Sequence, residues 1–133
     1  MYKEKVEFLT KQARNLDPYF EMVNSKKLIW ELKDELDEFI DAYNNNDFDE
    51  QEKELWDVFW VFELLLQKLE EEGNINIEDI YKKIYKKMSC RKSFLEEWKK
   101  VSAQEAKYIW NKAKKAEWYS DDRLWTEERT RCE

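Results

Sequence analysis

The fold is decided by residues 31–57, which read ELKDELDEFIDAYNNNDFDEQEKELWD. This segment holds twelve Asp or Glu residues and two Lys, which gives it a net charge of −10. Like charges at this density repel one another and usually mark a solvated face or a disordered segment. Apolar residues recur through the segment at helical spacing, however, so the pattern predicts two helices and raises the question of what their carboxylates bind.

The first of these helices is predicted over residues 26–43. At ~100° of rotation per residue, one arc of this helix is apolar and forms the core stripe. The stripe consists of Leu28, Ile29, Leu32, Leu36, Phe39, Ile40 and Tyr43. Glu35 lies where this stripe meets the acidic face, so it cannot be fully exposed. Glu31 and Glu38 flank it by about one turn, whereas Asp34 faces water.

The second helix is predicted to begin with a capping box at Asp47 and Glu50 and to end at Gly73. Glu54 and Asp57 share one of its faces with apolar residues that continue as core. Two carboxylates directed into a core are costly unless they pair with a basic side chain or bind a cation.

The residue types favour a hard divalent cation if a cation is bound. The chain contains no His and its two Cys are far apart, so oxygen ligands point to Mg²⁺, with Mn²⁺ as the alternative, rather than to Zn²⁺. The two helices would each supply a one-turn carboxylate pair, Glu35 with Glu38 and Glu54 with Asp57. Ion pairs with Lys or Arg, or a simply solvated face, remain the alternative.

The spacing Glu35-x-x-Glu38, fifteen residues, Glu54-x-x-Asp57 resembles the MazG family within the all-α nucleoside triphosphate pyrophosphatases. Further matches follow in register at residues 72–80, 87–91 and 106–117, so the likeness covers residues 24–118. Two departures stand out. Asp34 replaces the first Glu of the family's EExxE motif, and residues 92–94, Lys-Ser-Phe, replace its His-Pro segment.

The resemblance implies an all-α bundle of four to five helices that forms a homodimer or a dimer of dimers. It implies Mg²⁺-dependent hydrolysis of an NTP or dNTP to the monophosphate and pyrophosphate. Its catalytic residues would be Glu31, Glu35, Glu38, Glu54 and Asp57, of which the last four would bind metal and Glu31 or Glu38 would orient water. The expected phosphate ligands are Lys83, Lys87, Arg91 and Lys112, and the expected base contacts are Tyr19, Phe20 and Trp30.

Residues 82–100 form a basic segment with a net charge of +6. Ordinary solvated lysines explain such a segment equally well when it is considered alone. Together with the acidic segment, however, it fits a site for a metal–polyphosphate complex. Such a site needs carboxylates for the metal and cations for the phosphate oxygens.

Composition agrees with one helical domain, which we place at residues 1–118 and which is followed by a tail at 119–133. The 133-residue chain has one Gly, one Pro and 41% charged residues. These values suit long helices. Further helices are predicted at residues 2–16, after Asn76 and after Ser102, with a loop after Pro18. The net charge of −7 argues against non-specific binding to duplex nucleic acid.

The segment 58–66 is apolar nearly all round, which predicts a helix that is central and partly in a subunit interface, with Trp60, Phe62 or Leu64 in the contact. The segment is too short to span a membrane, and no signal peptide is visible. Cys90 and Cys132 are expected to be lone thiols, which suggests a reducing, cytoplasmic location.

Two other functions fit the same residues. One is a non-enzymatic helical module whose acidic face meets a basic partner, and the other is a protein that binds divalent cations without turnover.

Overall fold

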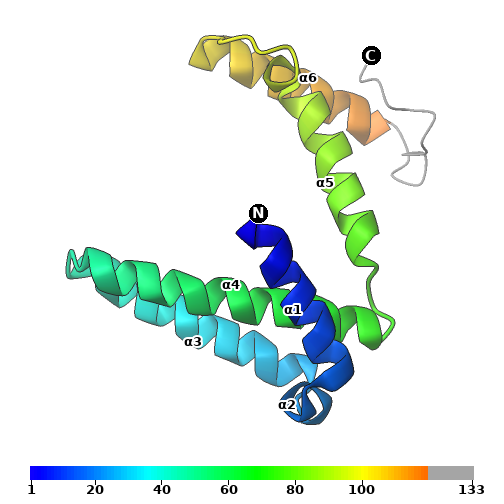
Figure 1. Cartoon of the computed structure of the whole chain (residues 1–133). Helices are drawn as coiled ribbons and strands as arrows, with labels where there is room; N and C mark the ends of the chain where they lie inside the picture. Colours follow the sequence, from blue (N-terminus) through cyan, green and yellow to red (C-terminus); the bar gives the residue numbers. More distant parts are fainter. Residues whose placement is uncertain (120–133) are drawn as a thin grey trace. The chain divides into compact units, whose positions relative to one another are not determined.

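The computed structural model describes residues 1–119 and is all-helical over that range (Figure 1). The elements are α1 (Tyr2–Leu16), α2 (Pro18–Met22), α3 (Ser25–Asn44), α4 (Phe48–Glu71), α5 (Ile77–Arg91), the short 3₁₀ helix η1 (Ser93–Leu95) and α6 (Ala103–Tyr119). No strand occurs among these residues, which confirms the predicted all-α class.

The chain divides into two compact units, Met1–Ile77 and Glu78–Glu133. The first unit contains both predicted acidic helices, and the second contains α6 and nearly all of α5. A single domain over residues 1–118 stays a prediction, and the predicted tail lies outside the described residues beyond position 119.

Side-chain caps set several helix starts where the sequence predicts them. The Asp47 carboxylate accepts a hydrogen bond from the Glu50 N–H (3.1 Å), which starts α4. The Ser102 hydroxyl accepts one from the Glu105 N–H (3.1 Å), which starts α6. Asn24 caps α3 in the same way, through the Lys27 N–H (2.8 Å).

The short helix α2 replaces the predicted loop after Pro18. The Asp17 side chain accepts a hydrogen bond from the Tyr19 N–H (2.9 Å), and Pro18 occupies the first helical position, where its missing N–H costs nothing. The break before Pro18 was therefore predicted correctly, but a new helix begins there at once and raises the number of α-helices to six.

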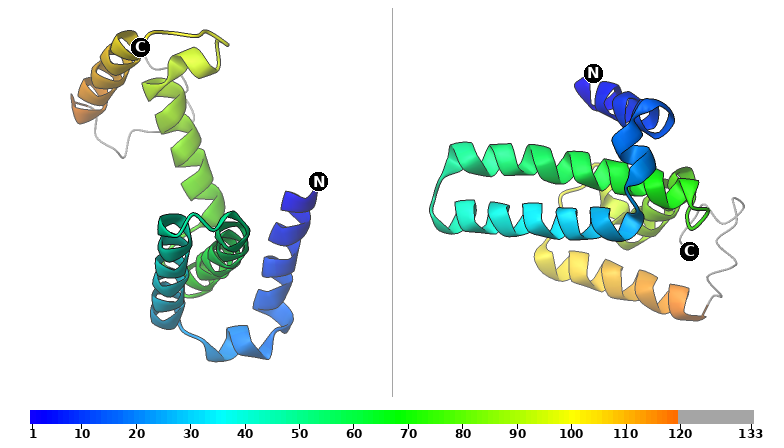
Figure 2. Two further views of the ribbon diagram at one scale, coloured as in Figure 1. Left: turned by 90° about the vertical axis from the view of Figure 1, so that its left-hand side faces the viewer. Right: turned by 90° about the horizontal axis from the view of Figure 1, so that it is seen from below.

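The first unit is built on an antiparallel pair of long helices, α3 and α4, which lie side by side in all views (Figures 1 and 2). Helix α1 crosses the C-terminal half of α4, where Arg14 Nη1 contacts Glu70 Oε1 at 2.8 Å. The core lies between these helices and α2, and its buried residues are Ala13, Phe20, Val23, Leu28, Val61, Leu64 and Leu65. Leu64 is 4% exposed and belongs to this core, so the expectation that it contacts a second subunit is wrong.

A buried lysine joins α4 to α2. The Lys68 Nζ donates to the Phe20 carbonyl oxygen (2.9 Å), pairs with Glu71 (3.2 Å) and lies over the Phe20 ring at 4.7 Å. Its charge is thus compensated although the residue is only 7% exposed.

The second unit is held by a half-buried ion pair between α5 and α6. Arg91 Nε lies 3.2 Å from both carboxylate oxygens of Glu117, and its guanidinium carbon lies 4.9 Å from the centre of the Trp110 ring. Cys90, next to Arg91, is buried and disulfide-bonded, so the expectation of a lone thiol is wrong for this residue. The inference of a reducing compartment loses that support.

Every helix within residues 1–119 is too short or too polar to span a lipid bilayer.

The contacts of Glu70 predict a pH-dependent contribution to stability. Its carboxylate accepts hydrogen bonds from the Ile77 N–H (2.7 Å) and from Arg14, and these contacts lower its pKa below the ordinary 4.5. Because the pKa of Glu70 is lower in the folded state, its ionised carboxylate stabilises the fold above pH ~4.5. This stabilisation is lost as the pH falls through the folded-state pKa.

We therefore expect Glu70→Gln to lower the melting temperature by a few degrees at neutral pH, and the difference from the wild type to disappear in acid. Thermal unfolding followed by circular dichroism across the pH range measures this. Glu52→Gln, on an exposed position of the same helix, is the control. Equal pH profiles for wild type and Glu70→Gln would contradict the assignment.

Candidate metal centre

Three acidic side chains from the two long helices converge in the first unit. Glu35 and Glu38 come from α3 and Glu54 comes from α4, and one carboxylate oxygen of each lies within 4.8 Å of the others. Packing of α3 against α4 creates this cluster, because Glu54 shares the face of α4 that carries the core residue Val61. Pairing of the two helices thus brings together carboxylates that are well separated in the sequence.

Two oxygen atoms of the cluster are buried and have no hydrogen-bond partner among the described residues. They are Oε2 of Glu35 and Oε2 of Glu54. Glu54 is 9% exposed and Glu35 is half-buried, whereas Glu38 is exposed. An acceptor that is removed from water and left unpaired is costly, so these two atoms are suited to a ligand that accepts their lone pairs.

The pKa values of the cluster reflect crowding of like charges. A hydrogen bond shared with Glu38, followed by burial, raises the pKa of Glu54 to about 8. Burial, followed by the charges of Glu38 and Asp57, raises the pKa of Glu35. Both effects disfavour the ionised forms in the absence of a cation, and a bound cation would reverse them.

The donor set fits a hard divalent cation such as Mg²⁺ or Mn²⁺, because it consists of carboxylate oxygens alone. Asp57 lies beside the cluster: it is exposed, and its charge contributes to the raised pKa of Glu35. The expectation that Asp57 points into the core is wrong, because α1 covers only the C-terminal half of α4 and leaves this turn open to solvent.

The other predicted residues of the first unit have separate environments. Glu31 accepts a hydrogen bond from the Tyr19 hydroxyl (2.6 Å), which raises the pKa of Tyr19 to about 12. Trp30 is exposed. Phe20 is 1% exposed in the core and already packs under Lys68, so the prediction that it contacts a base does not fit this structure.

The predicted phosphate ligands all belong to the second unit. Lys83, Lys87 and Lys112 are exposed. Arg91 differs, because it is engaged by Glu117, with an Nη2–Oε2 distance of 2.5 Å. A phosphate contact by Arg91 would require this ion pair to open.

The sequence matches the family model of the MazG nucleotide pyrophosphohydrolase domain over residues 23–94, more than half of the chain. The chain belongs to the MazG family. The matched range includes the carboxylate cluster, Lys87 and Arg91. Membership points to a nucleotide pyrophosphohydrolase.

A solved structure agrees with this assignment. The fold is similar to that of a MazG-related protein from Thermotoga maritima, with a TM-score of 0.78 and 27% sequence identity. The similarity covers 84% of this chain and 98% of that one. No curated protein matches the chain.

Sequence reasoning gave Glu50 no role in this MazG site beyond capping α4. In the structure Glu50 also shares a hydrogen bond with Glu54 that raises the pKa of Glu54. The i, i+4 spacing of the two residues was the available signal. Lys86, buried in α5, was likewise absent from the predicted set.

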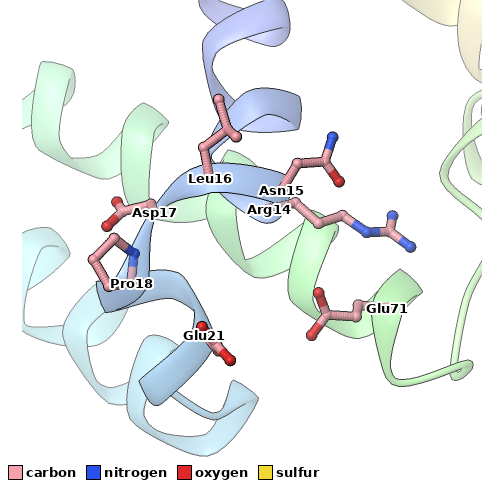
Figure 3. A pocket seen from close by; sticks show the side chains of 7 residues that line it. All are labelled: Arg14, Asn15, Leu16, Asp17, Pro18, Glu21 and Glu71. Carbon is pink, nitrogen blue, oxygen red and sulfur yellow. The ribbon is translucent and has the colours of Figure 1, made fainter.

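A cavity of about 640 Å³ lies at the turn between α1 and α2, and none of the predicted site residues lines it (Figure 3). Its lining is Arg14, Asn15, Leu16, Asp17, Pro18, Glu21 and Glu71. Most of its charged groups are already engaged: Arg14 binds Glu70, Asp17 caps α2 and Glu71 pairs with Lys68. We assign the cavity no role in the MazG reaction.

The raised pKa of Glu54 predicts how the metal-free protein responds to pH. Unfolded, Glu54 titrates near 4.5, and folded it titrates at about 8. Between these values the folded chain keeps a proton that the unfolded chain loses, so stability falls as the pH rises.

Glu54→Gln removes this titration, so its melting temperature in a chelating buffer should depend less on pH and should exceed that of the wild type at alkaline pH. Thermal unfolding from pH 4.5 to 8 measures both quantities. If the melting temperatures of the two proteins change with pH in the same way, the neighbours of Glu54 do not raise its pKa.

Proposed function

We propose that this MazG-family protein hydrolyses a nucleoside triphosphate to the monophosphate and pyrophosphate in a Mg²⁺-dependent reaction. The observation that carries the proposal is the convergence of Glu35, Glu38 and Glu54, with two buried carboxylate oxygens that lack partners. Family membership supplies the class of reaction.

Glu35, Glu38 and Glu54 would hold the metal, and Asp57, whose charge acts on Glu35, is the proposed fourth ligand. Bound Mg²⁺ would supply a Lewis acid for a phosphoryl oxygen and a water of lowered pKa. Glu35 and Glu54 are the residues whose burial fixes their direction, and Glu38 is the one that solvent reaches.

The chain offers Glu38 as the group that orients the attacking water and accepts its proton. Glu31 is less suited to this role, because its carboxylate already accepts a hydrogen bond from Tyr19. The water oxygen would bond to the α-phosphorus, and the bond from that phosphorus to the bridging oxygen would break and release pyrophosphate.

The exposed lysines of the second unit, Lys83, Lys87 and Lys112, remain the proposed partners of the phosphate oxygens. Arg91 would join them only after it leaves Glu117. Lysine ammonium groups suit this role because they are flexible point charges.

The decisive experiment is a panel of NTPs and dNTPs incubated with Mg²⁺, with the products identified. Pyrophosphate together with monophosphate supports the proposal, whereas orthophosphate indicates a different hydrolase. Mg²⁺-dependent stabilisation without turnover would favour a cation-binding protein, and neither effect would favour a helical interaction module.

The position of the carboxylates predicts unequal effects of two neighbouring substitutions. Glu35→Gln should lower kcat/KM by about 100-fold or more, as when a group that acts on the transition state is removed. Asp34→Asn is the matched control and should have little effect, because Asp34 is exposed and outside the cluster. Steady-state kinetics with the best nucleotide substrate measures both effects. Equal losses of kcat/KM in the two variants would contradict the assignment of Glu35, rather than Asp34, to the site.

Glu54→Gln and Asp57→Asn extend the comparison to α4. Both should abolish turnover while circular dichroism shows an unchanged helix content. Full activity of Glu54→Gln would overturn the metal assignment.

We also propose that the protein is at least a homodimer. Apolar residues spaced along one side of α4, Phe48, Leu55, Phe59 and Phe62, are all substantially exposed. A second set on α3, Ile29, Leu36 and Ile40, is exposed as well. Exposed apolar side chains in such number usually mark an interface, and homodimers bury them in a shared core.

Substitutions of exposed and of buried apolar residues on α4 distinguish an effect on assembly from an effect on folding. Phe62→Glu changes an exposed position (43%) and should give a folded monomer, whereas Leu64→Glu changes a core position (4%) and should prevent folding. Light scattering and circular dichroism distinguish these results. An active wild-type monomer of 16.6 kDa would contradict the dimer.

A further inference from the structure

Lys86 is a buried cation that has no hydrogen-bond partner among the residues that the structure describes. It lies in α5, is 8% exposed, and its Nζ makes no hydrogen bond. The other buried lysine of the described residues, Lys68, pairs with Glu71 and the Phe20 carbonyl, and the half-buried Arg91 pairs with Glu117. Lys86 therefore departs from the way in which this chain otherwise treats a buried positive charge.

An ammonium group removed from water is expensive unless a counter-charge or several acceptors compensate it. Lys86 presents three donors, and none of them reaches an acceptor of its own helix within hydrogen-bond distance. The nearby Ser89 hydroxyl donates to the Lys86 carbonyl oxygen (3.0 Å). This hydroxyl makes no hydrogen bond to the Lys86 Nζ.

The charge of the surrounding segment selects the sign of the ligand. Residues 82–100 carry a net charge of +6, and Lys83 and Lys87 flank Lys86 as exposed cations on the same helix. A positive potential raises the local concentration of anions. A neutral ligand would leave the buried charge uncompensated, whereas an oxyanion would accept its donors and balance it.

We infer that Lys86 is the centre of an oxyanion-binding site in the second unit, and that its ligand belongs to the phosphate class. Phosphate oxygens accept charge-assisted hydrogen bonds, which are the strong ones available to an ammonium group. The choice of pyrophosphate as the preferred ligand rests on the proposed function, which releases it, whereas the site itself rests on the burial and isolation of Nζ.

Binding can be tested without turnover and without metal. Melting temperatures are measured in a chelating buffer at constant ionic strength, with chloride replaced by phosphate, pyrophosphate or sulfate. A ligand that binds only the folded state raises the melting temperature. The variants are Lys86→Met and, as the matched control, Lys107→Met, which alters an exposed lysine of α6 in the same unit.

We expect pyrophosphate to stabilise the wild type and Lys107→Met, and Lys86→Met to bind it roughly tenfold or more weakly, as after loss of a charge-assisted hydrogen bond. Without added anion, Lys86→Met should be as stable as the wild type or more stable, because a buried charge is removed. If Lys86→Met folds poorly, Lys86→Gln provides the same comparison.

The outcomes separate this inference from the proposed function. Equal pyrophosphate stabilisation of wild type and Lys86→Met overturns the site at Lys86, even if NTP hydrolysis is observed. Stabilisation that depends on Lys86 in a protein that hydrolyses no NTP supports the site and removes the proposed function. Equal stabilisation by sulfate and pyrophosphate overturns the assignment to the phosphate class.

Discussion

The pairing of α3 with α4 is the constraint on which the rest of the first unit depends. The apolar stripe that joins these helices also brings Glu35 and Glu38 against Glu54, so hydrophobic burial forces like charges together. Burial and the neighbouring carboxylates accordingly raise the pKa values of Glu35 and Glu54. A cluster of this kind destabilises a protein that lacks a cation and becomes favourable when a cation binds, which is typical of a preorganised site rather than of a structural one.

Much of the fold was predictable because it follows from local chemistry. Helix periodicity and the caps at Asp47 and Ser102 are short-range features, and the structure confirms them. The helix α2 was missed because Asp17 both ends one helix and caps the next. A break signal in a sequence does not state whether the chain leaves the helical conformation or only changes direction.

The candidate site was predictable in its carboxylates and less so in its cations. Glu35 and Glu54 could be placed by helical phase, because the phase of an amphipathic helix fixes which residues face its neighbour. The exposure of Asp57 could not be predicted in this way, since it depends on how far α1 extends along α4. Arg91 and Lys86 show the same limit. Arg91 pairs with Glu117 of another helix, whereas the buried Nζ of Lys86 has no hydrogen-bond partner among the described residues. Both results depend on packing between helices, which the residue pattern of one helix does not predict.

The second unit distributes its positive charges in two ways. Arg91 is held by both oxygens of Glu117 and lies over Trp110, and the Lys92 Nζ lies 5.9 Å from the centre of the same ring. Breaking a half-buried ion pair leaves a carboxylate without its partner, which is more costly than moving a solvated lysine. A phosphate group that approaches this unit would therefore meet lysine ammonium groups at a lower cost than the guanidinium. The charge of Arg91 joins α5 to α6, so in the proposed reaction the phosphate oxygens would be left to the exposed lysines.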